Sequence, residues 1–311
     1  MKNWFALVLA GAFVQAACAS PDPQSAEDDL TSCSGAKLDS KGTCRSKKGV
    51  YAKASCCAVT APASRQNLDT YTCSASSTPI KVAFFDADST LRVSKSGSVT
   101  ANSVEDVNVL PFAASKIAEL SHSGMLVAIV SNQGGVASGK QTFEVAEGAL
   151  VFAAKQLAKL GGKIDYIDLA EKLDDNRKPE TGMAKQLDAL LQEKCGVGID
   201  IPGSQMVGDS GYKTGVDGPH PDGRPADDFS NADRLFAENL GVPFQEPTDY
   251  FGWKAYEVYN IASQAELVSL LGKIDAEIAT LRSSGEDPAR LAALEAEVAG
   301  NRKVNALPAS P

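Results

Sequence analysis

Residues 81–91 of this chain read KVAFFDADSTL. The apolar-rich run from Lys81 to Phe85 is typical of a strand buried in a sheet, and it ends directly at Asp86. Asp88 follows one residue later, so two carboxylates stand where the chain leaves the sheet. One such carboxylate can attack phosphorus while the other moves the proton of a leaving alcohol. Because a D-x-D string also occurs in solvated turns and calcium loops, its meaning depends on the rest of the chain.

Short apolar runs alternate with helical patterns along the chain after this string. The patterns predict strands at 81–85, 125–130, 164–169 and 205–207, and helices at 110–123, 142–160 and 182–194. This repetition predicts an α/β domain, a Rossmann-like parallel sheet with helices on both faces. In such sheets the chemistry gathers beyond the carboxyl ends of the strands, so the residues that follow the strands are the candidates for a site.

Polar side chains follow the other predicted strands as well. Ser131 and Asn132 follow the second strand, and Asp209 follows the fourth. The hydroxyl and the amide suit phosphate oxygens, and Lys178 offers a cation for the charge of an intermediate. Carboxylates that face a phosphate need a cation between them, and Mg²⁺ favours such hard oxygen ligands. The sequence therefore predicts a magnesium-dependent phosphate site.

The order Asp-x-Asp, Ser-Asn, Lys, Gly-Asp resembles the four motifs of the haloacid-dehalogenase superfamily of phosphatases. More narrowly, the chain resembles the 3′-phosphatase domain of polynucleotide kinase-phosphatase over about residues 79–252. The strings that carry this resemblance are SNQGG at 131–135, RKPETGM at 177–183, VGD at 207–209 and, as the most specific, DFSNADRLFAENLG at 228–241.

The resemblance implies a haloacid-dehalogenase-like phosphatase fold and a mechanism on particular residues. It implies Asp86 as the nucleophile and Asp88 as the general acid/base. It implies Mg²⁺ held by the Asp86 carboxylate, the main-chain carbonyl of Asp88 and Asp209. Asp88 is followed by Ser89, where the superfamily usually has glycine, so we expect this loop to sit slightly differently.

The resemblance also implies how phosphate is bound. Ser131, Asn132 and Lys178 match the phosphate-binding positions, and Arg177 is a candidate cation on the substrate side. The expected substrate is a 3′-phosphorylated end of DNA or of an oligonucleotide. The segment GGVASGKQ at 134–141 mimics an ATP-binding P-loop, but Gln141 replaces the hydroxyl residue that binds magnesium, so no ATP binding is predicted.

The insertions of the predicted domain are short, and two alternative functions stay open. The segments 91–110 and 135–177 hold too little for a large cap, so we expect a minimal cap and an open site, which suits a polymer end. A small-molecule phosphatase of the histidinol-phosphate or heptose-bisphosphate kind is the first alternative. The second is a non-catalytic, exported binding module on the same scaffold.

The first nineteen residues are predicted to be a signal peptide. Lys2 precedes an apolar run, Trp4 to Val14, and Ala17-Cys18-Ala19 forms an A-x-A cleavage site. We therefore expect an exported protein, periplasmic or extracellular, with no transmembrane span in the mature chain. Simple cleavage is favoured, and lipidation at Cys18 is the alternative.

Residues 20–78 are predicted to be a linker and a cysteine-rich segment. An oxidising compartment favours disulfides among its cysteines, which are Cys33, Cys44, Cys56, Cys57 and Cys73. Their number is odd, so one of them either pairs with Cys195 or stays free. A zinc site is the alternative, but no C-x-x-C pair or nearby histidine supports it.

The phosphatase domain is predicted at 79–262 and a helical hairpin at 263–311. The hairpin is interpreted as a docking element or as the contact of a dimer. The whole chain has a formal net charge of −9. This balance argues against an extended basic surface for duplex nucleic acid, although a small cationic pocket for one phosphate remains compatible with it.

Overall fold

The computed structural model describes residues 37–38, 44–45, 68, 71–73 and 78–308. The chain divides into two compact units, residues 1–62 and 63–311. In the first unit, strands β1 (Lys37–Leu38) and β2 (Cys44–Arg45) pair antiparallel. The predicted signal peptide, Cys18, Cys33, Cys56 and Cys57 lie outside the described residues.

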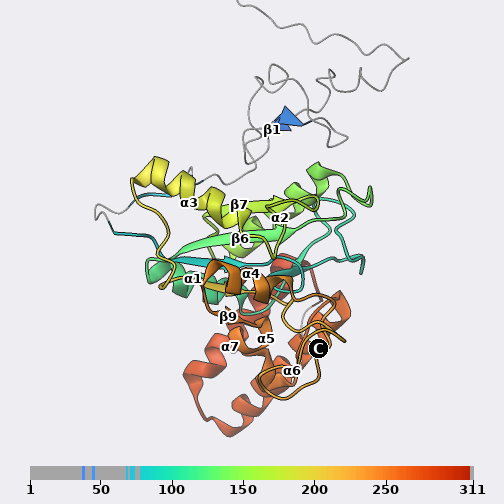
Figure 1. Ribbon diagram of the computed structural model, residues 1–311. Coiled ribbons are helices and arrows are strands. Elements are labelled where there is room, and N and C mark those ends of the chain that lie inside the picture. Colours follow the sequence, from blue (N-terminus) through green and yellow to red (C-terminus); the bar gives the residue numbers. More distant parts are fainter. Residues whose placement is uncertain (1–36, 39–43, 46–67, 69–70, 74–77, 309–311) are drawn as a thin grey trace, which may run out of the picture. The chain divides into compact units, whose positions relative to one another are not determined.

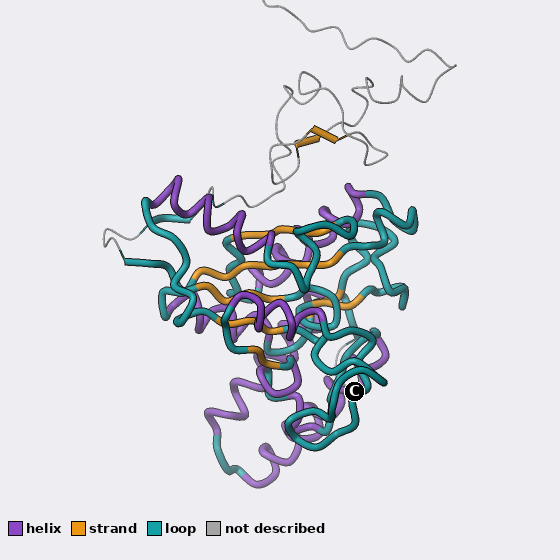
Figure 2. Tube along the Cα trace, in the orientation of Figure 1, coloured by secondary structure: helices purple, strands orange, loops and turns teal. Residues whose placement is uncertain are grey.

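The second unit is built on a parallel sheet with the strand order β7-β6-β3-β8-β9. Figure 2 draws these strands as neighbouring orange bands. The predicted α/β fold is therefore confirmed. The strand β9 was not predicted, because two residues beside prolines carry no strand pattern. The bounds are β3 (Val82–Phe85), β6 (Leu126–Asn132), β7 (Tyr166–Ala170), β8 (Gln205–Val207) and β9 (Phe244–Gln245).

Helices cover both faces of this sheet because alternate side chains of each strand point to opposite faces. On β3, Ala83 and Phe85 join the core under α1 (Ala113–His122) and α2 (Phe143–Lys159). Phe84 joins the opposite core, under α3 (Gly182–Cys195) and α4 (Ala232–Leu240). With both faces buried, β3 reads as a continuous apolar run, which explains why the sequence identified it.

A pair of C-terminal helices packs on the first of these faces. They are α6 (Gln264–Ser284) and α7 (Pro288–Asn305), which Figure 1 shows side by side in orange and red. They follow the short helices α5 (Pro247–Tyr250) and η3 (Trp253–Tyr256). Their apolar stripe, which includes Leu270, Ile274 and Val298, is buried in the core shared with α1 and α2. The predicted helical tail is thus present and docks on its own domain, whereas the dimer contact stays a prediction.

No helix in the described part of the chain combines the length and the apolar character that crossing a membrane requires.

The last helix also binds the edge of a small hairpin. Strands β4 (Arg92–Val93) and β5 (Asn108–Val109) pair antiparallel. The Val109 N–H donates to Asn305 Oδ1 over 2.8 Å, and the Val109 carbonyl accepts from Asn305 Nδ2 and Asn301 Nδ2 over 2.8 and 3.1 Å. Both asparagines are buried. Their amide groups therefore satisfy the main chain of β5 where a further strand would otherwise pair.

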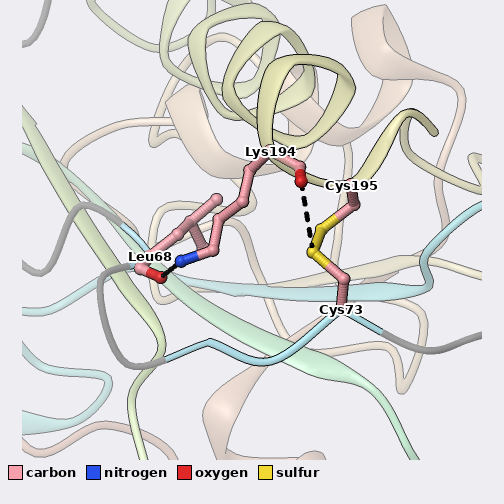
Figure 3. The surroundings of a disulfide bond; sticks show 4 residues. All are labelled: Leu68, Cys73, Lys194 and Cys195. Atoms are coloured by element: carbon pink, nitrogen blue, oxygen red, sulfur yellow. Dashed lines mark hydrogen bonds between the residues drawn. A yellow bond between two sulfur atoms is a disulfide. The ribbon is translucent and has the colours of Figure 1, made fainter.

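A disulfide joins the segment before the sheet to the end of α3. Cys73 and Cys195 are bonded with their Cα atoms 5.5 Å apart, as Figure 3 shows. Lys194, one residue earlier, donates from Nζ to the carbonyl of Leu68. Of the two alternatives for the odd cysteine, the structure selects pairing with Cys195.

Removing this disulfide should destabilise the domain. A Cys73→Ala/Cys195→Ala double variant frees a loop of 122 residues in the unfolded chain. We expect the free energy of unfolding to fall by about 2–5 kcal/mol. Urea denaturation of the full chain measures this difference. Recovery of both cysteines as alkylated thiols in the non-reduced wild-type protein would contradict the assignment.

Removing one asparagine clamp should weaken the docking of the C-terminal helices. Asn305→Ala leaves the buried Val109 N–H without its acceptor, which should lower the free energy of unfolding by about 1–3 kcal/mol. Asn239→Ala is the matched control, because Asn239 is exposed and makes a hydrogen bond to Pro179. Equal urea midpoints for the two variants would show that the clamp contributes nothing.

Candidate active site

The predicted site residues meet at the carboxyl edge of the sheet. Asp86 follows β3, Ser131 lies near the end of β6, and Asp209 follows β8 after one glycine. Lys178 comes from the loop between β7 and α3. Because these strands are parallel neighbours, their carboxyl ends meet at one edge, as the sequence analysis anticipated.

A buried lysine bridges two of the carboxylates at this edge. Lys178 Nζ lies 2.6 Å from Asp86 Oδ1 and 2.6 Å from Asp233 Oδ1. The Lys178 and Asp233 side chains are each 2% exposed. Burial opposes the charge of the ammonium, but Asp233 and Asp86 outweigh it and raise the pKa of Lys178. The lysine is therefore held as a cation in direct contact with Asp86.

The charged form of the carboxylates is disfavoured here, because they are buried and lie close to one another. Burial, reinforced by Asp233 and Asp88, raises the pKa of Asp86 to about 7, although Lys178 pulls it down. Burial, followed by the charges of Asp86 and Asp233, raises the pKa of Asp209 well above its ordinary range. One ammonium thus does not balance the negative charge gathered here.

This donor set fits a divalent cation. Asp86, Asp209 and Asp233 each offer a carboxylate oxygen, and these oxygens lie within 4.8 Å of one another. The carboxylate of Asp209 accepts no hydrogen bond from the residues that the structure describes, so it is available as a ligand. Hard, charged oxygens close together match the preference of Mg²⁺. The predicted ligand from Asp88, its main-chain carbonyl, stays a prediction.

Asp88 lies beside this cluster with both of its oxygens occupied. Arg92 Nε donates to Oδ1 over 3.0 Å, and Gln133 Nε2 donates to Oδ2 over 2.7 Å. The side chain is 37% exposed, so it can meet both solvent and a substrate. The next residue, Ser89, has a φ of 59°, the left-handed conformation that glycine adopts without strain. The chain therefore keeps the tight turn despite the serine.

The three remaining predicted residues have different surroundings. Ser131 Oγ accepts from Gln133 Nε2 over 2.9 Å. The Asn132 side chain binds the main chain of Lys178, accepting from its N–H and donating to its carbonyl over 2.9 Å each. The structure thus gives Asn132 a part in placing the lysine. The Arg177 guanidinium packs over Gly134, where an added Cβ would lie 3.0 Å from Nη1.

Asp233 is the site residue that the sequence analysis did not assign. It lies in the first turn of α4, and its Oδ2 accepts from the Ser210 N–H over 3.1 Å. A Cβ at Gly208 would come within 2.3 Å of that oxygen, so only glycine fits there. One signal was present in the sequence. Asp233 shares the buried face of α4 with Phe236 and Ala237, where an acid needs a partner.

A network of ion pairs forms one side of the hollow next to Asp209. His220 Nδ1 lies 2.6 Å from Glu246 Oε1, and Arg224 Nη2 donates to Glu246 Oε2 over 3.1 Å. Asp228 accepts from two main-chain N–H groups, including that of Tyr212 over 2.6 Å. The guanidinium pairs with Glu246, whereas Asp228 is held by the main-chain N–H groups, and together they form a wall of the hollow. The hollow is lined by Ser89, Asp209, Asp228, Glu246, Pro247, Trp253, Tyr259 and Asn260.

Comparison with known proteins finds relatives among known sequences and among solved structures. An uncharacterized 20.8 kDa protein of Autographa californica nuclear polyhedrosis virus is 29% identical over 170 residues, 55% of this chain and 85% of the viral protein. The D-glycero-β-D-manno-heptose-1,7-bisphosphate 7-phosphatase of Pseudomonas aeruginosa is 31% identical over 105 residues, 32% of this chain and 56% of that enzyme. The crystal structure of D,D-heptose 1,7-bisphosphate phosphatase from B. bronchiseptica, complexed with magnesium and phosphate, is 23% identical with a TM-score of 0.40, and covers 53% of this chain and 79% of its own.

The model of the family described as polynucleotide kinase 3 phosphatase matches residues 81–251. This range holds the sheet, the bridged lysine and each of the carboxylates described above. The chain therefore belongs to the polynucleotide kinase 3 phosphatase family, and it is a phosphatase of the haloacid-dehalogenase type.

Proposed function

We propose that this phosphatase is a magnesium-dependent phosphomonoesterase that removes the terminal phosphate from 3′-phosphorylated DNA or oligonucleotides. The observation that carries the chemistry is the contact of Asp86 with the buried Lys178 beside Asp209. It supplies a nucleophilic carboxylate, a fixed cation and ligands for a metal in one place. The family match supports the choice of substrate.

The reaction divides between Asp86 and Asp88. An Asp86 oxygen attacks phosphorus, a carboxylate–phosphorus bond forms, and the bond from phosphorus to the leaving oxygen breaks while Asp88 gives that oxygen a proton. Water then attacks the aspartyl-phosphate, Asp88 takes the proton of the water, and inorganic phosphate leaves with Asp86 restored. Lys178 offsets the charge that develops on the phosphoryl oxygens.

The other residues bind and orient the reacting groups. Asp86 and Asp209, with the main-chain carbonyl of Asp88 that the resemblance implies, would hold Mg²⁺, which when bound offsets the carboxylate charges and polarises the phosphate. The two oxygens of Asp233 already accept from Lys178 and from the Ser210 N–H. Asp233 and Asn132 are positioning residues for Lys178. Ser131 and Arg177 are proposed to contact the phosphate and the substrate beyond it.

The shape of the protein around the site supports a polymer end as substrate. The connection from β6 to β7 holds one helix, α2, and the connection from β3 to α1 holds only the β4–β5 hairpin. Neither is large enough to enclose a small molecule. A sugar phosphate is the second candidate, favoured by the identity to the Pseudomonas aeruginosa enzyme.

Export is proposed from the sequence of the first nineteen residues. An exported enzyme would meet fragments of extracellular DNA, whose phosphate it could release. ATP is not part of the proposal, because the segment 134–141 lacks the hydroxyl residue of a P-loop.

Asp86→Asn should abolish turnover and leave the fold intact. The amide cannot form the carboxyl-phosphate bond, so we expect phosphate release to fall by at least about 10³-fold. Lys178 keeps Asp233 as a partner, so the variant should still fold. Acid-quenched single turnovers should show a phosphoenzyme only for the wild type. Asp249→Asn, at a carboxylate that is 51% exposed, is the control, and unchanged activity in Asp86→Asn would refute the nucleophile.

The substrate is tested by phosphate release from the full chain with Mg²⁺ or with a chelator. The panel contains a 3′-phosphorylated oligonucleotide, its 5′-phosphorylated twin, nucleotides and sugar phosphates that include a heptose bisphosphate. We expect release from the 3′ end alone, and loss of that release in the chelator. Release from sugar phosphates alone would keep the mechanism and replace the substrate. No release at all would support the non-catalytic alternative.

A further inference from the structure

We propose that Arg92 is a positioning residue, which orients the Asp88 carboxylate for proton transfer. This inference rests on the proposed function, because it assumes that Asp88 is the general acid/base. Arg92 stands outside the four motifs and was not selected from the sequence.

Arg92 is a buried cation with one side-chain partner. The residue is 1% exposed, and its Nε donates to Asp88 Oδ1 over 3.0 Å. Nη1 and Nη2 are buried and make no hydrogen bond to any part of the chain that the structure describes. Burying a guanidinium is costly unless a carboxylate compensates for it, and Asp88 is the carboxylate in contact. We therefore take the ion pair with Asp88 as the reason that Arg92 is kept in this buried position.

Asp88 is fixed from its other side by a chain of amides. Gln133 Nε2 donates to Asp88 Oδ2, and Gln133 Oε1 accepts from Gln141 Nε2 over 2.9 Å. With a donor on each oxygen, the carboxylate plane has one orientation. Without Arg92, one anchor would remain on a side chain that is 37% exposed, and the carboxylate could rotate away from the leaving oxygen.

The main chain around Arg92 is held as firmly as its side chain. The Arg92 N–H donates to the Ala87 carbonyl, and the Arg92 carbonyl accepts from the Ser89 N–H over 2.8 Å. Arg92 pairs with Val109 in the β4–β5 hairpin, and Asn305 of α7 binds the main chain of Val109. The C-terminal helices lie beyond the residues that match the family, yet they support the strand opposite Arg92.

The test compares leaving groups that do and do not need a proton. The alkyl phosphate of the panel that the wild type hydrolyses fastest needs general acid catalysis, whereas p-nitrophenyl phosphate does not. Rapid quench measures formation of the phosphoenzyme in the first turnover. For Arg92→Met we expect a loss of about 100-fold with the alkyl phosphate and less than about 5-fold with p-nitrophenyl phosphate. Arg92→Lys keeps a cation beside Asp88 and should recover part of the alkyl rate.

Arg302→Met is the matched control. Arg302, on α7, also pairs with a carboxylate, that of Asp275 over 2.6 Å, but this pair does not include Asp88. This variant should leave the ratio of the two rates unchanged. If Arg92→Met does not fold by circular dichroism, the same ratio is measured for Arg92→Gln. If Arg92→Met slows both substrates equally, or slows neither, the role of Arg92 is overturned and the proposed function still stands. A wild type that forms no phosphoenzyme with either substrate would overturn the proposed function as well.

Discussion

The rest of the site depends on one buried ammonium group that lies between two carboxylates. Lys178 lies 2.6 Å from both Asp86 and Asp233; the Lys178 and Asp233 side chains are 2% exposed and that of Asp86 is 11% exposed. A buried charge is tolerated only with its partner in place, so the loop that carries the lysine, the end of β3 and the start of α4 must be held together. Asn132 adds to this by binding the lysine main chain from β6. The fold thus brings together elements far apart in sequence around a single cation.

The sequence predicted the sheet and much of the site because both leave local patterns. A strand buried on both faces is an apolar run, so β3 and the position of Asp86 at its end could be located directly. Ser131 and Asp209 were found by the same logic. Asp233 and Arg92 were not, because their significance depends on partners elsewhere in the fold, Lys178 for the first and the turn at Asp88 for the second. The sequence likewise could not predict which surface the C-terminal helices pack against, because an apolar stripe shows that a helix face is buried but not what buries it.

The parts of the domain outside the family match contribute to its stability at two separate places. The disulfide from Cys73 fixes the chain before the sheet to the end of α3. Asn301 and Asn305 fix the β4–β5 hairpin from α7. The hairpin in turn carries Arg92, so the second attachment bears on the surroundings of Asp88, while the first joins α3 at its far end from the loop of Lys178. Stability and geometry of the site therefore have partly separate sources.

The contact between Gly208 and Asp233 has a consequence for how this chain can evolve. Any side chain at position 208 would collide with the carboxylate that holds Lys178, whatever its polarity or charge. The two positions are therefore coupled: a lineage that keeps the aspartate has a single amino acid open to it at 208. Replacing the aspartate alone does not remove the collision, because the Cβ of residue 233 would itself lie 2.7 Å from a Cβ at 208. In a set of related sequences, a residue other than glycine at 208 would mark a protein that has abandoned the bridged lysine, and with it the arrangement on which phosphate transfer is proposed to depend.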